Sequence, residues 1–253
     1  MSTTHHPLGI DIGGSGIKGA PVDLDKGEFA KDRLRFDTPE KSTPKAVAAV
    51  VAQIAERFED ATGDSPIGVT VPAVVVNGVV RTAANIDRAW IGTDAAKLLS
   101  DKLGRPVTVV NDADAAGVGE LHYGAARDTP GLVLMATLGT GIGTALLHNG
   151  VLIPNSELGH LELDGHDAEQ RASAAVREQG NLSWEDWAER LQRYFAHLEN
   201  LLWPDLIVVG GGVSRKAEKF LPLLHLRAPI VPAQLENAAG IIGAAWLATH
   251  AGA

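Results

Sequence analysis

Residues 14–20 read Gly-Ser-Gly-Ile-Lys-Gly-Ala and residues 139–145 read Gly-Thr-Gly-Ile-Gly-Thr-Ala, so the chain carries nearly the same segment twice, 125 positions apart. Each copy follows a short apolar run, Leu8–Ile12 in the first half and Leu132–Leu138 in the second, and another apolar run follows each copy. Both copies are therefore predicted to form a strand, a glycine-rich turn and a second strand.

Turns of this kind are suited to anion binding. Glycine lets backbone N–H groups close on an anion without a Cβ in the way. Ser15 and Thr140 add a hydroxyl donor to the two turns. One such hairpin in each half predicts two similar lobes that hold a phosphate chain from opposite sides.

The composition narrows the class of protein. A chain of 253 residues fits one or two domains with a substantial core. The absence of cysteine excludes disulfides, thiolate catalysis and cysteine-based zinc sites, and the net charge of −9 argues against nucleic acid as a partner. No segment reaches the roughly 18 apolar residues of a membrane span, so we expect no membrane partner and a cytoplasmic location.

The chain alternates predicted strands and helices. Strands are expected at 29–36, Ile67–Val71, Val107–Val110 and Leu206–Val209. Helices are expected to begin at Pro44, after caps at Asp94 and Ser183, from Ser214, and over 236–249. The polar segment 164–180 has little periodicity and is expected to be a mobile loop or a short helix.

Asp11 ends the first predicted strand, directly before its glycine-rich turn. A carboxylate at this place is able to hold Mg²⁺, usually through water, beside the phosphates that the turn binds. The alternative is a plain turn residue whose side chain bonds its own backbone. Lys18 has two equally weighted interpretations, a phosphate contact or an exposed strand lysine.

Asn111 and Asp112 follow the predicted strand Val107–Val110 and begin the next helix. Ligand-binding and catalytic side chains gather at the carboxyl ends of strands in α/β sheets. A carboxylate there is able to take a proton from a substrate hydroxyl while the neighbouring amide orients the substrate. The alternative is that either residue is only a helix cap.

Glu157 and His160 lie three positions apart next to a glycine, and together they offer an acceptor and a donor to adjacent hydroxyl groups. A structural salt link is one alternative, and a metal site built with Glu162 is another. Gly211 and Gly212 follow the strand at 206–209 and fit a phosphate or nucleotide contact at a helix start, although close strand–helix packing explains them equally well.

Taken in order, these segments resemble the ROK family of bacterial sugar kinases. The residues that carry the resemblance are Asp11-Ile12-Gly13-Gly14-Ser15-Gly16, Asn111-Asp112-Ala113-Asp114, Leu138-Gly139-Thr140-Gly141-Ile142-Gly143 and Glu157-Leu158-Gly159-His160. Within the family the chain looks most like the polyphosphate-using glucokinases of actinobacteria, through 85–92, 182–188 and 208–214.

The resemblance implies an α/β fold of the two-lobed actin, hexokinase and Hsp70 type, which is ribonuclease H-like, with duplicated βββαβα units. The expected lobes are residues 1–111 with 236–253, and residues 112–235. It implies a kinase that phosphorylates the 6-hydroxyl of glucose or a related hexose, with Mg²⁺ as cofactor and polyphosphate, ATP or both as co-substrate. It also implies a homodimer.

The resemblance assigns roles to single residues as well. Asp112 is the expected general base. The expected sugar-binding residues are Asn85, Asn111, Asp112, Glu157, His160 and Glu162, with Glu169 as an extra candidate. Asp11 is expected to organise Mg²⁺. The expected phosphate- or donor-binding residues are Asp11, Gly13, Gly14, Ser15, Gly16, Lys18, Thr140, Gly141, Gly211 and Gly212.

One departure from the family concerns zinc. Typical ROK kinases carry a cysteine-rich zinc motif that also engages the histidine equivalent to His160, and this chain has no cysteine. We therefore expect no zinc site, with His160 oriented by hydrogen bonds alone. The departure favours the polyphosphate-using subgroup without fixing the donor.

The donor is the least determined part of the prediction. A polyphosphate chain favours a row of cations, for which the candidates are Arg171, Arg177, Arg190, Arg193, Arg215, Lys216 and Lys219. An ATP-dependent hexokinase for glucose, mannose or fructose is the main alternative. A sugar-sensing regulator of the same family is a weaker one, because the first turn begins only 13 residues into the chain.

Overall fold

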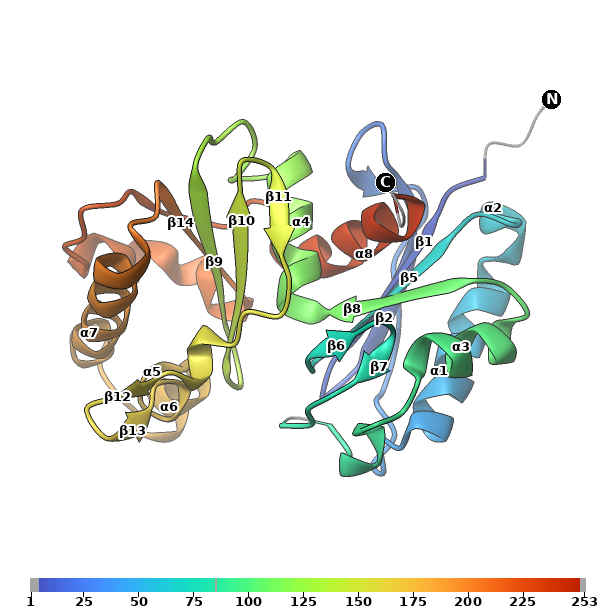
Figure 1. Cartoon of the computed structure of the whole chain (residues 1–253), viewed down its shortest axis with the longest axis horizontal. Coiled ribbons are helices and arrows are strands. Elements are labelled where there is room, and N and C mark those ends of the chain that lie inside the picture. Colours follow the sequence, from blue (N-terminus) through green and yellow to red (C-terminus); the bar gives the residue numbers. More distant parts are fainter. Residues whose placement is uncertain (1–4, 85, 251–253) are drawn as a thin grey trace. The chain divides into compact units, whose positions relative to one another are not determined.

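A computed structural model describes residues 5–84 and 86–250 of the chain. The chain forms two compact units, residues 1–119 with 238–253 and residues 120–237, and the boundary between them falls inside helix α4, Asp112–Tyr123. Figure 1 labels helices and strands of each unit where there is room.

The first unit is built on a mixed sheet. Its strands lie in the order β3-β2-β1-β5-β8, and β4 also pairs with β2. β1 pairs antiparallel with β2 and parallel with β5, and β5 pairs parallel with β8. The bounds are β1 Leu8–Ile12, β2 Ile17–Asp23, β3 Glu28–Phe29, β4 Leu34–Phe36, β5 Ile67–Val71 and β8 Val107–Asn111.

The second unit repeats this plan. Its sheet has the order β11-β10-β9-β14-β15, again with two antiparallel pairings followed by two parallel ones. The bounds are β9 Leu132–Leu138, β10 Ile142–His148, β11 Val151–Ile153, β14 Leu206–Gly210 and β15 Ile230–Pro232. The duplicated fold expected from the sequence is therefore confirmed.

The two glycine-rich turns occupy equivalent places but differ in length. In the first unit, Ile12 pairs with Ile17 across the four residues Gly13–Gly16. In the second unit, Leu138 pairs with Ile142 across the three residues Gly139–Gly141. The hairpins therefore share their geometry on the sheet while their turns differ by one residue.

Side-chain caps start the main helices where the sequence predicts them. The Thr43 side chain accepts from the N–H of Ala46 at the start of α1, Pro44–Arg57, and Asp94 accepts from Lys97 at the start of α3, Ala95–Leu103. The side chain of Ser183 accepts from Asp186 at the start of α7, Trp184–Leu202. The last helix is α8, Ala239–Thr249, with a single 3₁₀ turn η5, Glu236–Ala238, before it.

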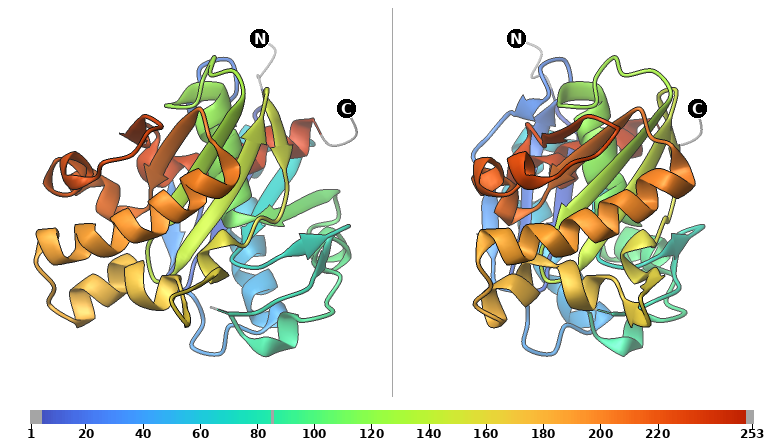
Figure 2. Two further views of the ribbon diagram at one scale, coloured as in Figure 1. Left: turned by 60° about the vertical axis from the view of Figure 1, so that its left-hand side comes forward. Right: turned by 90° about the vertical axis from the view of Figure 1, so that its left-hand side faces the viewer.

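Helix α7 contributes large apolar side chains to the core of the second unit. Figure 2 shows it lying across one face of the sheet that contains β9, β10 and β14. Trp187, Leu191, Tyr194, Phe195 and Leu198 are fully or almost fully buried, and they belong to one apolar cluster with side chains of β9 and β14. Core packing therefore explains the aromatic stripe of this helix.

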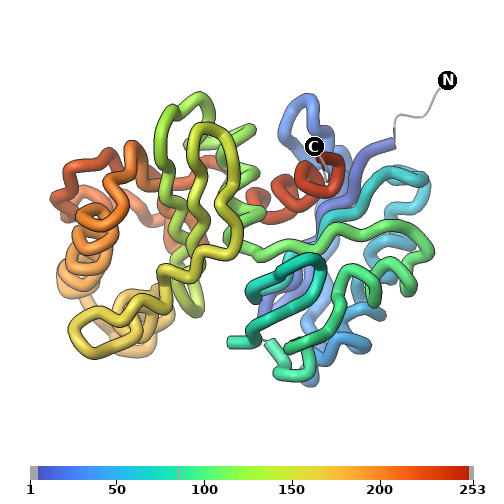
Figure 3. The backbone as a smooth tube through the Cα atoms, in the orientation of Figure 1, coloured from blue at the N-terminus to red at the C-terminus, as the bar shows by residue number. Residues whose placement is uncertain are grey.

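Helix α8 packs on the first unit by direct backbone contact. Figure 3 shows this C-terminal helix beside the N-terminal strands β1 and β5. A Cβ added at Gly9 would lie 2.0 Å from the carbonyl oxygen of Ile241, and one at Gly68 would lie 1.9 Å from that of Ala244. The strands need glycine at both positions because the helix backbone fills the space of a side chain.

Three expectations need correction. The predicted strand 29–36 is two short strands, β3 and β4, which both pair with β2. For the segment 164–180 the loop interpretation is wrong and the short-helix interpretation is confirmed in part. The segment completes the hairpin of β12 (Glu162–Leu163) with β13 (His166–Asp167) and then forms the short helices α5 (Glu169–Ala172) and α6 (Ala174–Gln179). The segment after Gly211 is the 3₁₀ element η3, Gly212–Lys219, which is interrupted by a non-helical Lys216.

Smaller elements complete the two units. The first contains α2 Glu59–Thr62, η1 Arg88–Trp90 and the hairpin of β6 Val75–Val76 with β7 Val79–Val80. The second contains η2 Leu158–His160 and η4 Leu221–Leu223. Within residues 5–84 and 86–250, no helix has the length and apolar character that crossing a membrane requires.

Replacing Gly68 with alanine tests the close packing of α8. The added methyl group would collide with the carbonyl of Ala244, and we expect the free energy of unfolding to fall by about 1–3 kcal/mol. Urea unfolding followed by circular dichroism measures this loss. Gly14→Ala is the matched control, because no atom lies within 4 Å of a Cβ at Gly14. Equal stability of the two variants would contradict the packing argument.

Candidate active site

Asp11 is held from both sides of its strand. It stands opposite Lys18 of β2 and opposite Thr70 of β5 in the strand register. The Thr70 hydroxyl donates to Asp11 Oδ1 over 2.9 Å, and Lys18 Nζ lies 3.8 Å from Asp11 Oδ2. The Asp11 side chain keeps 24% of its surface exposed. The carboxylate is therefore held by residues of the two neighbouring strands and is still accessible.

The first glycine-rich turn is fastened by two side chains that the sequence did not single out. Thr38 donates its hydroxyl to the Gly13 carbonyl over 2.6 Å, and Arg35 Nη2 donates to the Ser15 carbonyl over 2.9 Å. A Cβ at Gly16 would lie 2.8 Å from Arg35 Nε, so the guanidinium occupies the space beside this glycine. The first turn thus carries an additional cation, Arg35, beside its exposed tip.

A small pocket adjoins this turn within the first unit. Its volume is about 140 Å³, and it is lined by Gly13, Gly14, Thr38, Ser42 and Ile86, among others. The following segment is anchored, since Trp90 Nε1 donates to the Ser42 carbonyl and the buried Trp90 ring packs in the core. Asn85, a predicted sugar-binding residue, lies outside the described residues.

Asn111 and Asp112 lie where β8 passes into α4. The buried Asn111 side chain accepts from the N–H groups of Ala113 and Asp114, and its amide donates to the Ala73 carbonyl. Asn111 is therefore the cap of α4. Asp112 is the first residue of the helix and is only partly buried, at the same carboxyl-end edge of the sheet as Asp11 and Thr70.

The second turn has a carboxylate as its neighbour. Glu169 Oε2 accepts from the N–H of Ile142 over 3.0 Å, and a Cβ at Gly141 would lie 2.2 Å from the same oxygen. The Gly139 N–H donates to the Gly141 carbonyl. Thr140, between these two glycines, is exposed.

Strand β10 brings Glu157 and His160 to the second turn. Thr144 of β10 donates its hydroxyl to the Ser156 carbonyl and accepts from the Leu158 N–H. A Cβ at Gly159 would lie 1.9 Å from the Ile142 carbonyl, so the glycine lets η2 lie directly on the first residue of β10. The predicted sugar-binding pair and the predicted phosphate turn are therefore neighbours within one unit.

His160 is oriented by a hydrogen bond to Asp167, which the sequence did not single out. Its Nδ1 lies 2.9 Å from Asp167 Oδ2, while its Nε2 lies 3.8 Å from Glu157 Oε2. The bond to Asp167, with the nearby carboxylates, raises the pKa of His160. Burial raises the pKa of Glu157, and the charge of Glu169 adds to that increase.

Of the two glutamates in the metal-site alternative, Glu157 lies near His160, whereas Glu162 does not belong to the described group of possible ligands around it. Among the described residues, His160, Asp167 and Glu169 present ligand atoms within 4.8 Å of one another, a spacing that suits a cation. Glu162 is exposed on β12, opposite Asp167 in the hairpin register. The hydrogen bond to Asp167 satisfies His160 Nδ1 without a metal.

The glycines after β14 have different tasks. Gly211 has a φ of +84°, and a Cβ there would lie 2.3 Å from the Leu138 carbonyl, so close packing explains it. Gly212 has open space around it and lines a pocket together with Gly139 and Thr140. Because η3 is an interrupted 3₁₀ element, the helix start predicted to receive an anion here is absent from the described chain.

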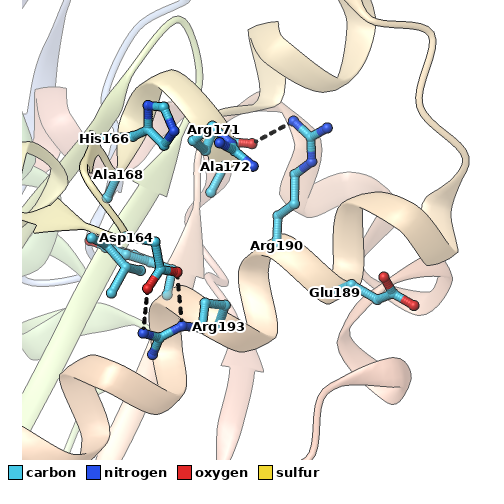
Figure 4. Close-up of a pocket in the computed structure, with 10 residues that line it drawn as sticks. Asp164, His166, Ala168, Arg171, Ala172, Glu189, Arg190 and Arg193 are labelled. Carbon is cyan, nitrogen blue, oxygen red and sulfur yellow. Dashed lines mark hydrogen bonds and ion pairs between the residues drawn. The ribbon is translucent and has the colours of Figure 1, made fainter.

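Five of the seven predicted cations line two separate pockets, and Arg215 and Lys219 line neither. Arg171, Arg190 and Arg193 line a pocket of about 200 Å³ beside α5 and α7, shown in Figure 4. There Arg193 forms a two-fold hydrogen bond with Asp164, and Arg190 donates to the Arg171 carbonyl. Arg177 and Lys216 instead line the pocket beside the second turn.

The sequence of the chain is similar to those of known sugar kinases. Residues 7–173 match the ROK family. The chain is 52% identical over 245 residues to a polyphosphate glucokinase of Mycobacterium tuberculosis, which covers 96% of this chain and 91% of the relative.

Solved structures give the same result. An inorganic polyphosphate/ATP-glucomannokinase from Arthrobacter sp. strain KM is 53% identical and superposes with a TM-score of 0.93, covering 96% of this chain and 98% of that one. A ROK family glucokinase from Streptomyces griseus, solved with glucose and AMPPNP, has a TM-score of 0.83 at 23% identity over 96% of this chain and 99% of that one, and shares the fold.

Asp167→Asn tests the orientation of His160. The asparagine keeps an oxygen for the Glu169 N–H but loses the charge that favours the protonated ring, so we expect the pKa of His160 to fall. Titration of the ring protons by NMR measures the change. Asp164→Asn is the control, since Asp164 of the same hairpin pairs with Arg193 instead. An unchanged pKa in the Asp167 variant would show that the bond does not govern the ring.

Proposed function

The chain belongs to the ROK family, and we propose that it is a glucokinase that transfers a phosphoryl group from inorganic polyphosphate to the 6-hydroxyl of glucose, with ATP as a second donor. The observation that carries the proposal is the contact of η2 with β10, which joins the pair Glu157 and His160 to the second glycine-rich turn. A hydroxyl-binding pair beside a phosphate-binding turn suits a sugar kinase. The 52–53% identity to polyphosphate-dependent relatives supports the choice of donor.

Glu157 and His160 are the proposed ligands of the sugar ring. An ionised Glu157 accepts from a hydroxyl, and His160 Nε2 engages a second one because Nδ1 is committed to Asp167. Asn111 keeps one amide hydrogen after its bond to Ala73, and we assign it to the sugar. Asn85, which lies outside the described residues, and Glu162, which is exposed on β12, complete the proposed set.

Asp112 is the proposed general base. Its carboxylate takes the proton of the 6-hydroxyl as the sugar oxygen forms a bond to the terminal phosphorus of the donor. The bond between that phosphorus and the bridging oxygen breaks, and the shortened phosphate chain leaves with the electron pair. Asp112 suits this task because it is only partly buried at the start of the helix, where its Oδ1 accepts from the Ala113 N–H over 2.9 Å and is thereby held in direction.

The two turns are the proposed phosphate sites. The first offers Gly13, Gly14, Ser15, Gly16 and the cation Lys18, and the second offers Thr140 and Gly141, with Gly212 beside it. These donors neutralise charge on the transferring oxygens, which is the main demand of phosphoryl transfer. Gly211 supports this region by its packing on Leu138 and has no open side toward a ligand.

Mg²⁺ is the proposed cofactor, and the residues present fit it. Asp11 provides an accessible oxygen whose direction is set by Thr70. The ammonium of Lys18 near the other oxygen opposes direct binding of a second cation, which favours attachment through water. When bound, Mg²⁺ supplies positive charge to the phosphate oxygens.

We further propose that the protein is a homodimer and is located in the cytoplasm. Leu201 and Trp203 at the end of α7 are exposed large apolar side chains, which suits an additional contact surface. Light scattering coupled to gel filtration measures the oligomeric state, and a monomeric mass at micromolar concentration would contradict the dimer.

Asp112→Asn tests the general base. Without the carboxylate we expect kcat to fall by ~10²–10⁴-fold, while the dissociation constant of glucose stays close to that of the parent protein. A coupled glucose 6-phosphate assay and calorimetry measure the two quantities. A near-native kcat would remove Asp112 from this role.

The raised pKa of Glu157 predicts that glucose binding depends on pH. Its raised pKa means that the carboxyl becomes protonated, and loses acceptor capacity, at a higher pH than the roughly 4.3 of an ordinary glutamate. The KM for glucose should therefore begin to rise above that pH as the solution is acidified. Glu157→Gln should raise KM about tenfold and abolish this acid limb. Identical pH profiles of the two proteins would contradict the assignment.

Competition between donors tests the substrate. We expect phosphorylation of glucose with polyphosphate as the sole donor, and a slower or equal rate with ATP. The assay uses each donor alone and then both together at fixed glucose and Mg²⁺. Activity with ATP and none with polyphosphate would replace the proposed function with the ATP-dependent hexokinase.

A further inference from the structure

Three cations of the second unit gather around Trp184. The Arg177 guanidinium carbon lies 3.5 Å from the centre of the Trp184 ring, and Lys219 Nζ lies 5.7 Å from it. Lys216 lines the same pocket as Arg177 and Trp184. The sequence analysis predicted these cations as part of one long row. In the structure, Arg177 and Lys216 line a different pocket from the arginines beside α5 and α7.

Arg177 is presented by an aromatic stack. The Trp184 ring lies nearly parallel to Phe220, with an interplanar angle of 12° and centroids 6.0 Å apart, and it carries Arg177 at its centre. A stacked guanidinium keeps its N–H edge for a planar anion. Arg177 Nε is buried without a hydrogen-bond partner in the described chain. The stack thus fixes the side chain, and because Nε is buried, the donors that can reach a ligand are those of the two Nη groups, for which no hydrogen bond is found among the described residues.

The charge of this group is not neutralised. Among the described residues, no carboxylate forms an ion pair with Arg177, Lys216 or Lys219, and Glu178 is the single acidic residue in the pocket lining. The other cation group differs, because Asp164 neutralises Arg193 over 2.7 Å and the Arg190 guanidinium is bonded to a carbonyl. A polyanion therefore finds more uncompensated charge beside Trp184.

This pocket is continuous with the second turn. Its volume is about 220 Å³, and its lining includes Gly139, Thr140 and Gly212 together with Arg177 and Lys216. The N–H of Ala175 donates to the Gly139 carbonyl over 3.0 Å, which ties helix α6, and with it Arg177, to the turn. A phosphate chain that leaves the turn on this side meets these two cations next.

The pocket suits a phosphate chain better than a nucleoside. Arg177 covers one face of Trp184 and Phe220 lies parallel to it, so the ring offers a base little open surface for stacking. The volume also falls below the roughly 300–1,000 Å³ of typical pockets for drug-sized ligands. Cations with open donors bind phosphate oxygens whatever the length of the chain.

We propose that Arg177 and Lys216, supported by Lys219, form a subsite for the phosphate units of polyphosphate that lie beyond those bound at the second turn. The proposal rests on the proposed function and adds to it a reason for preferring long donors. Each further phosphate that reaches the subsite gains charge-assisted hydrogen bonds, so affinity rises with chain length until the subsite is filled.

Arg177→Ala and Lys216→Ala test the subsite. The probes are long-chain polyphosphate, tripolyphosphate and ATP, each assayed with saturating glucose and Mg²⁺. In both variants we expect the KM for long-chain polyphosphate to rise about tenfold, with kcat unchanged and smaller changes for the two short donors. Lys216 is exposed, so its variant reports on the subsite even if loss of the Arg177 stack disturbs folding.

Arg227→Ala is the matched control. Arg227 stacks on Trp203 at 3.6 Å in the same unit, which repeats the geometry of Arg177 away from the pocket. We expect this variant to keep the parent KM for all three donors. An unchanged KM for long polyphosphate in the two test variants would overturn the subsite, as would an equal rise for all donors or a rise for ATP alone.

The parent protein separates the two levels of the proposal. Failure of the parent to use any polyphosphate would refute the proposed donor and the subsite together. Use of polyphosphate by the parent, with no effect of either variant, would refute the subsite alone.

Discussion

Backbone packed directly on backbone, at positions that only glycine can occupy, is the constraint on which both units depend. In the first unit, α8 rests on Gly9 and Gly68 of the central strands, and a Cβ at Gly243 of α8 would lie 1.7 Å from the Ala115 carbonyl of α4. In the second unit, Gly159 sets η2 on β10, and Gly211 sets the end of β14 against Leu138. The contacts of the second unit bring the candidate sugar-binding pair and the pocket lining to the same turn.

Hydrogen bonds then fix the side chains that the backbone has brought together. Asp11 has a threonine on one side and a lysine on the other, and His160 has Asp167. Glu169 contributes twice, because one of its oxygens accepts from Ile142 at the second turn and the other lies 3.9 Å from His160 Nδ1. In both units, contacts from neighbouring strands and hairpins therefore fix the positions of the candidate side chains.

Much of the fold could be predicted from local sequence. The two hairpins, the helix start at Pro44, the caps at Asp94 and Ser183, and the apolar stripe of α7 follow from short-range patterns, and the structure confirms them. Short-range patterns could not reveal Arg35, which reaches Ser15 across 20 positions, or the interrupted element after Gly211. Asp167 lies in a polar segment with no periodicity, so its bond to His160 became visible only when the hairpin of β12 and β13 folded. The roles of the candidate residues stay predictions.

The unequal length of the two turns bears on the history of the chain. The last paired residues before the two turns are Ile12 and Leu138, which are 126 positions apart. The first paired residues after the turns are Ile17 and Ile142, which are 125 positions apart. If the halves descend from one ancestral unit, a residue was gained or lost inside the turn itself. A shift within either strand would have moved every buried side chain to the opposite face of the sheet, so the turn was the place where a change in length left the core intact.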